Sequence, residues 1–200
     1  MPLVSYEIEV KFKVDDFAPV RRALRRAGAR YIATVIQTDR YYDTADRMLL
    51  GRDCGLRIRL FRPVRSAAGG IDTRPLLTAK GPRSGRAAKF RQEVQTRLKD
   101  PQAVVSILEA MGLELTLSIQ KRRATYTWNG CLVELDDLPV IGKFIEVEAG
   151  SEKALDRICR RLGLQAERIT EHYVNLLQAA GGVPWPGRSF RLARRAGNPR

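Results

Sequence analysis

The chain has 200 residues, of which 44% are hydrophobic and 29% charged, a composition typical of a globular protein with an ordinary core. Its apolar runs fall short of the ~18 residues that a membrane-spanning helix needs, and its first residues lack a secretory pattern, so we expect no membrane partner. The net charge of +14 favours an anionic partner, such as nucleic acid or a phosphorylated small molecule, without choosing between them.

The first predicted elements are a strand, a helix and a second strand. Residues 5–13 alternate between apolar and charged side chains, the period of a strand with one buried face. A helix follows, for which Asp15 or Asp16 is the expected cap and Gly28 the end. Residues 31–42 are predicted to form the second strand.

The third predicted strand, residues 54–61, places Arg57 and Arg59 on one face and apolar residues on the other. We expect these two arginines to form a cluster of like charges. A loop over residues 62–74 then leads to a returning strand over residues 76–80.

The second half of the chain repeats the first pattern. A charged strand over residues 90–95 precedes a helix that Asp100 begins and Gly112 ends. Strand, helix, glycine and strand thus occur twice, which predicts two similar halves packed as one unit. The remaining predicted elements are strands over 115–128, 131–138 and 141–149 and helices over 152–162 and 168–180.

These elements predict one α+β domain over residues 1–180. Residues 181–200 carry five arginines and no acidic residue, and we interpret them as a disordered basic tail. The cysteines are Cys54, Cys131 and Cys159; their odd number and wide spacing predict core thiols in a reducing, cytoplasmic compartment.

Charged residues recur two positions apart on most of the predicted strands. Residues i and i+2 share a face, so each pair lies opposite an apolar face. These faces can be the solvated side of ordinary antiparallel sheets. The number of pairs favours instead a sheet curled into a barrel, with helices outside and charges inside. The pairs are Glu7 and Glu9, Arg57 and Arg59, Arg91 and Glu93, Lys121 and Arg123, Glu134 and Asp136, and Glu146 and Glu148.

The paired carboxylates predict a metal site made of oxygen ligands. Like charges two residues apart repel, and a divalent cation relieves that repulsion. The chain has a single histidine, His172, which we interpret as a surface or lid residue. Mg²⁺, Mn²⁺ or Ca²⁺ therefore fits best, while the arginines and lysines supply donors for phosphate oxygens.

The motifs, taken in order, resemble those of the CYTH superfamily, the triphosphate tunnel enzymes, over residues 5–178. Glu7-Ile8-Glu9-Val10-Lys11 is similar to the Glu-x-Glu-x-Lys opening of that family. Within it, the chain looks most like the class IV adenylate cyclases. Further segments that carry the resemblance are residues 38–44, 56–59, 77–82, 91–93, 121–123, 135–136, 141–148 and 173–177.

The resemblance implies an antiparallel eight-stranded closed β-barrel that binds a triphosphate substrate such as ATP together with Mg²⁺ or Mn²⁺. The implied catalytic residues are Glu7, Glu9, Lys11, Glu146 and Glu148. The implied phosphate-binding residues are Lys11, Arg57, Arg59, Lys80, Arg91, Lys121 and Arg123. The implied metal ligands are Glu7, Glu9, Glu93, Asp136, Glu146 and Glu148.

Two positions depart from the family pattern. Gln95 replaces a carboxylate that many relatives have, and Glu171-His172 replaces a basic residue and a serine before the last tyrosine. Asp39 and Asp43 are interpreted as structural residues, at turns or as hydrogen-bond partners of the tunnel arginines.

Three functions are compatible with these motifs. The leading hypothesis is a cyclase that converts ATP to cyclic AMP and pyrophosphate. The first alternative is hydrolysis of inorganic or thiamine triphosphate, because one sequence does not show which phosphorus faces the nucleophile. The second is a non-catalytic module for polyphosphate or nucleic acid, which the acidic pairs and the absence of an RNA-binding aromatic motif disfavour. The oligomeric state, including a homodimer, is left open.

Overall fold

The computed structural model of the chain describes residues 3–68, 70–84, 89–181 and 188–192. Within these ranges, the side chains of Glu7 and Arg91 lie outside the described part, although their backbones pair with each other.

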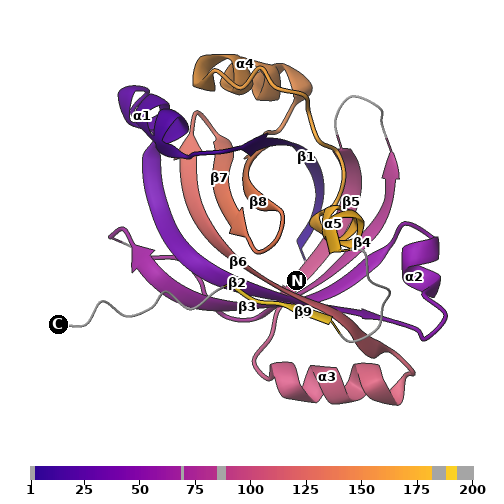
Figure 1. The fold of residues 1–200 in the computed structure, drawn as a ribbon. Coiled ribbons are helices and arrows are strands. Elements are labelled where there is room, and N and C mark those ends of the chain that lie inside the picture. The colour runs from indigo at the N-terminus through magenta and orange to yellow at the C-terminus, as the bar shows by residue number, and fades with distance from the viewer. Residues whose placement is uncertain (1–2, 69, 85–88, 182–187, 193–200) are drawn as a thin grey trace.

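The fold is built on one curled sheet of eight long antiparallel strands, with a short ninth strand added in parallel (Figure 1). Neighbouring strands follow the order β2-β3-β4-β5-β1-β8-β7-β6, and β2 also pairs with β6. This confirms the α+β class and the antiparallel sheet. The strands are β1 (Leu3–Val14), β2 (Arg30–Asp43), β3 (Gly55–Ser66), β4 (Leu76–Ser84), β5 (Lys89–Arg97), β6 (Glu114–Trp128), β7 (Cys131–Leu138), β8 (Gly142–Glu148) and β9 (Arg188–Phe190).

Helices lie on two opposite sides of the curled sheet. Figure 1 shows α1 and α4 together over one side, α3 on the opposite side, and α5 near the concave side. The order strand, helix, strand recurs as β1-α1-β2 and β5-α3-β6. No helix in the described part of the chain is long and apolar enough to cross a bilayer. The helices are α1 (Ala18–Arg26), α2 (Met48–Gly51), α3 (Pro101–Ala110), α4 (Glu152–Leu162) and α5 (Tyr173–Gly181).

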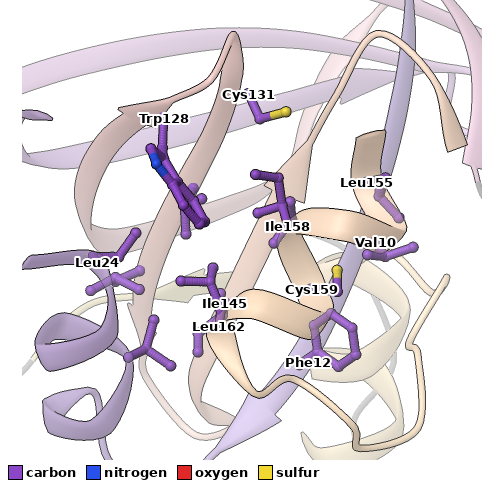
Figure 2. Packing of buried hydrophobic residues seen from close by; sticks show 14 of the residues in the cluster. Val10, Phe12, Leu24, Trp128, Cys131, Ile145, Leu155, Ile158, Cys159 and Leu162 are labelled. Carbon is purple, nitrogen blue, oxygen red and sulfur yellow. The ribbon is translucent and has the colours of Figure 1, made fainter. Parts of the chain in front are cut away.

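The largest hydrophobic core lies between the sheet and the α1–α4 layer. Val10 and Ile145 project outward from β1 and β8 and pack with Leu155 and Ile158 of α4 (Figure 2). Because side chains alternate along a strand, burying these residues outside turns the charged residues between them toward the concave face. The apolar outer core thus fixes the direction of the charged side chains.

Of three predicted helix boundaries, two differ from the structure and one matches it. Local contacts explain each outcome. Neither Asp15 nor Asp16 caps α1, because the cap position belongs to Phe17, which makes no side-chain cap. Asp100 does cap α3, accepting from two backbone amides at 3.0 Å. The predicted helix over residues 168–180 begins only at Tyr173, because the Ile169 amide donates to the Lys11 carbonyl at 2.9 Å and keeps that segment extended.

The predicted loop between the third and fourth strands is shorter than expected, because β3 extends to Ser66 and pairs with β2 along this length, with one shift of register. Sequence analysis also missed α2. This helix is only four residues long, and Asp43 anchors it by accepting from the amides of Leu49 and Leu50 at 2.9 and 3.0 Å. The structural role predicted for Asp43 is therefore confirmed.

Part of the predicted disordered tail is ordered. Leu117 to Ile119 of β6 pair in parallel with β9. Phe190 packs against the cluster that contains Leu117 and Leu177. The expectation of disorder is thus wrong for β9, whereas residues 182–187 and 193–200 lie outside the described residues.

Replacing Phe190 with alanine should lower the free energy of unfolding by about 1–3 kcal/mol, less than for a fully buried phenylalanine, because this ring is only partly buried. Urea unfolding of the full chain measures the effect, with Ser189→Ala at the exposed neighbouring position as the control. Equal unfolding midpoints for both variants and the wild type would show that β9 contributes nothing to stability.

Candidate active site

A cavity of about 420 Å³ lies on the concave side of the sheet. The inward-facing residues of the strands line most of it, and α2 and the first turn of α5 complete the wall. The acidic and basic side chains are not mixed at random around this cavity.

Acidic residues come from four neighbouring strands, β5, β1, β8 and β7. We call this set the acidic arc; it consists of Glu93, Glu9, Glu146, Glu148 and Glu134. Basic residues come from the other side of the sheet, from β6, β3 and β4. We call this set the basic arc; it consists of Lys121, Arg123, Arg57, Arg59 and Lys80.

One lysine lies within the acidic arc. The Lys11 ammonium is 3.1 Å from Glu9 and 3.2 Å from Glu146, and the residue is only 2% exposed. Burial alone would lower the pKa of Lys11, but the carboxylates of Glu9 and Glu146 outweigh it and raise that pKa well above its ordinary value. Lys11 therefore stays charged and holds two acidic strands together.

One aspartate plays the mirror role within the basic arc. Asp39 accepts from Arg59 Nε and Nη2 at 2.6 and 2.8 Å and from Arg57 Nη1 at 3.4 Å. Burial would raise the pKa of Asp39, yet the guanidiniums of Arg59 and Arg57 hold it well below its ordinary range. The predicted partnership of Asp39 with Arg57 and Arg59 is confirmed. The predicted cluster of like charges is partly compensated, because the single negative charge of Asp39 contacts both arginines.

A denser network joins the two arcs where β6 meets β7. Asp136 accepts from Lys121 Nζ at 2.7 Å and from Arg123 Nε at 2.6 Å. Arg123 also contacts Glu134 and Glu146. Burial and the neighbouring Arg123 lower the pKa of Lys121, because Asp136 and Glu146 only partly compensate for them. The basic side chains at this junction are held in place before any ligand arrives.

Glu148 differs from the other acids because it makes no ion pair with any residue in the described part of the chain. Burial, together with the negative charges of Glu134, Glu9 and Glu93, raises the pKa of Glu148 to about 7. Negative charge is therefore in local excess at this point of the acidic arc.

The acidic arc fits a divalent cation in its chemistry, since its donors are carboxylate oxygens and a cation would relieve the crowding at Glu148. Within the described residues, no three histidine, cysteine or acidic side chains converge as a ready-made metal site. The reason is visible in the ion pairs: Glu9 contacts Lys11, Glu93 contacts Lys80 at 2.5 Å, and Glu146 contacts Arg123. A metal would have to exchange with these internal cations.

The structure brings most of the predicted site residues to one cavity. Asp136 is 0% exposed and lies under Lys121 and Arg123, so it does not line the cavity. The side chains of Glu7 and Arg91 lie outside the described part. The predicted residues that do line the cavity are Glu9, Lys11, Arg57, Arg59, Lys80, Glu93, Lys121, Arg123, Glu146 and Glu148.

Sequence analysis missed several residues that line the cavity. Glu134 was placed with Asp136 on the inward face of its strand, but no role in the site was predicted for it. Tyr41 lies two positions after Asp39 on β2, so strand alternation places both side chains on the same face. Tyr173 lay in a matched motif, but no spacing rule places it near the strands. Gln95 also lines the cavity and donates to Glu93, so the amide still contacts the acidic arc.

Comparison with known proteins gives the family. A model of the CYTH domain matches residues 5–172, and the chain therefore belongs to the CYTH domain family. A protein of Methanocaldococcus jannaschii named "putative adenylate cyclase" is 29% identical over 173 residues, which is 86% of this chain and 88% of that protein.

Solved structures share the fold. The PH1819 protein of Pyrococcus horikoshii has a TM-score of 0.73 at 27% identity, over 86% of this chain and 98% of its own. The Hippeastrum protein HpAC1, named as an adenylyl cyclase but described as having a dominant triphosphatase activity, has a TM-score of 0.65 at 16% identity, over 90% of this chain and 96% of its own. The similarity to HpAC1 concerns the fold alone.

Replacing Asp39 with asparagine should lower the free energy of unfolding at neutral pH by about 3–5 kcal/mol, because Arg57 and Arg59 would be left buried together without their counter-ion. The pKa of Asp39 in the folded protein lies below its ordinary 3.8, so its stabilisation is complete above that pH and is lost as the pH falls below it.

Urea unfolding between about pH 7 and pH 3 measures both effects. The wild type should lose more stability over this acid range than Asp39→Asn, and the exposed Asp16→Asn should behave like the wild type. Parallel stability curves for the wild type and Asp39→Asn would contradict the assigned role of Asp39.

Proposed function

We propose that this CYTH domain protein is a divalent-metal-dependent enzyme that acts on a nucleoside triphosphate, converting ATP to cyclic AMP and pyrophosphate. The observation that carries the proposal is the division of one cavity into an acidic and a basic arc. A bound triphosphate and its cation have the complementary division of charge. A solvent-exposed polar face would not need to bury Lys11, Asp39 and Asp136 to hold such an arrangement.

The basic arc is suited to a chain of phosphates. Arg57 and Arg59 present planar guanidinium forks, which bind phosphate oxygens with two parallel hydrogen bonds, and Lys80 and Lys121 add compact positive charges. Asp39 and Asp136 hold Arg57, Arg59 and Lys121 in position in the free protein. The arc therefore stabilises negative charge as it builds up on the phosphates.

The acidic arc is suited to the cation. Glu9, Glu146 and Glu148 would hold Mg²⁺ or Mn²⁺, with Glu93 as a further candidate ligand on the cavity wall. When bound, the ion supplies positive charge to the phosphate and to the attacking oxygen. Lys11, in contact with Glu9 and Glu146 within this arc, would offer a positive charge to a phosphate oxygen near the cation.

The cyclisation itself is a substitution at phosphorus. The ribose 3′-hydroxyl gives its proton to water, its oxygen bonds to the α-phosphorus, and the bond from that phosphorus to the pyrophosphate oxygen breaks. The basic arc stabilises the leaving pyrophosphate. In the alternative reaction, water attacks the γ-phosphorus and the bond from that phosphorus to the oxygen of the β-phosphate breaks. Orthophosphate and the corresponding diphosphate are released. HpAC1, which shares the fold, is described as having a dominant triphosphatase activity. Hydrolysis is therefore tested alongside cyclisation.

We further propose that the curled sheet acts as a closed tunnel. The pairing of β2 with β3 on one edge and with β6 on the other supports closure. A closed wall excludes water from the charged groups, which strengthens each of their contacts with a ligand.

Product analysis tests the reaction. The full chain is incubated with ATP, inorganic triphosphate and thiamine triphosphate, each with Mg²⁺, with Mn²⁺ or with EDTA. We expect cyclic AMP and pyrophosphate from ATP, and no turnover in EDTA. Release of orthophosphate from inorganic or thiamine triphosphate instead of cyclic AMP would assign the hydrolase, and full activity in EDTA would refute metal dependence.

In the same assay, Glu9→Gln and Glu148→Gln should each lower turnover by roughly a hundred-fold or more, the scale on which removal of one charge-stabilising group acts. Glu152→Gln, at an exposed position on α4, provides the matched control.

The variant Arg59→Ala tests the basic arc separately. Removing one charge-assisted contact should weaken binding of inorganic triphosphate by roughly ten-fold to a hundred-fold. The free energy of unfolding should also fall, because Asp39 loses the guanidinium that donates two hydrogen bonds to it. Calorimetric titration at a temperature where every variant is folded measures affinity, with Arg62→Ala, exposed on the same strand, as the control. Unchanged affinity in Arg59→Ala would place the phosphate chain elsewhere.

A further inference from the structure

Tyr173, the first residue of α5, connects the two arcs of the cavity. Its ring centroid is 5.1 Å from the ammonium of Lys11 and 4.9 Å from that of Lys121. Both distances fall within the ~6 Å range of a cation–π contact. Phe144 supports the ring from the side, edge to face, with centroids 5.2 Å apart at 71°. One aromatic ring therefore contacts the lysine of the acidic arc and a lysine of the basic arc.

The hydroxyl of Tyr173 is the unexplained part of this arrangement. The oxygen is buried and has no hydrogen-bond partner within the described part of the chain, although the residue lines the cavity. Burying a polar group without a partner costs free energy, so such groups usually have a reason. Burial, together with Asp136 and Glu146, raises the pKa of Tyr173 well above its ordinary value. The hydroxyl thus keeps its proton and is available as a donor.

The position of this donor is fixed before any ligand binds. Leu177, one turn further along α5, is 1% exposed and packs in a cluster with Leu117, Ile119 and Phe144. This contact anchors the helix, and the ring contacts with Phe144 and the two lysines fix the rotation of the side chain. A hydroxyl that has no acceptor, on a ring that contacts two ammonium groups, is suited to an anionic oxygen.

We propose that Tyr173 is a further ligand-binding residue, whose hydroxyl donates a hydrogen bond to a phosphate oxygen while its ring keeps Lys11 and Lys121 in place. This inference rests on the proposed triphosphate function. It adds a donor from α5, which none of the strand motifs provides. A purely structural Tyr173 would need only its ring, for packing on Phe144.

The variant Tyr173→Phe separates the two roles, because it removes the hydroxyl and keeps the ring. Binding of inorganic triphosphate should weaken by roughly ten-fold, the effect of losing one hydrogen bond to a charged group. The melting temperature without ligand should stay the same or rise, because the unpartnered buried hydroxyl is gone. Tyr173→Leu, which removes the ring as well, should weaken binding further.

Affinity is measured by calorimetric titration with inorganic triphosphate, first without metal and then with Mg²⁺, and stability by thermal melting of the free protein. Tyr126→Phe is the matched control, since Tyr126 packs on the outer core against Tyr31. A Tyr173→Phe protein with wild-type affinity would overturn the inference, whatever its melting temperature. A wild type that binds no inorganic triphosphate in either condition would instead refute the proposed function itself.

Discussion

Buried charges must be paired, and this requirement governs the rest of the structure. Lys11, Asp39 and Asp136 are 2%, 4% and 0% exposed, and an isolated charge at such depth would cost several kcal/mol. Each is therefore surrounded by opposite charges on its own or a neighbouring strand. Strand register has to bring these partners together, and register is fixed where one face of the sheet is buried. The hydrophobic layers under α1, α3 and α4 thus do more than stabilise the fold: they hold the charged face in order.

The same pairing explains how a charged interior can serve a function. In the free protein, Lys11 partly compensates the charges of Glu9 and Glu146, and Asp39 partly compensates those of Arg57 and Arg59. A triphosphate and a cation would offer these groups new partners of the same sign as the old ones. For the protein's own charged groups, binding is then an exchange of ion pairs. Such an exchange keeps the desolvation cost low, because the groups are already out of water.

Alternation along strands made the charged face predictable from sequence, and the fold followed from it. Spacing places Glu146 and Glu148 on one face whatever their neighbours are. The contact of Asp39 with Arg59 depends on the register of β2 against β3, which no single strand encodes. Asp43 anchors α2 through amides six and seven residues away, a local geometry without a strong pattern. Tyr173 reaches Lys11 and Lys121 only because α5 folds back to the concave side, a tertiary event that periodicity does not report.

Charge alone does not separate the two reactions that such a site can support. Cyclisation and hydrolysis both need phosphates on the basic arc and a cation on the acidic arc, and they differ in which phosphorus lies between the arcs. Which phosphorus lies there depends on the position in which the triphosphate binds along the cavity. Outside the two arcs, the cavity wall formed by α2 contributes Leu49 and Leu50, which carry no charge. If the proposed function holds, shape and apolar contact at this wall are a means of selecting between the reactions, while the arcs would bind the phosphates that both reactions share.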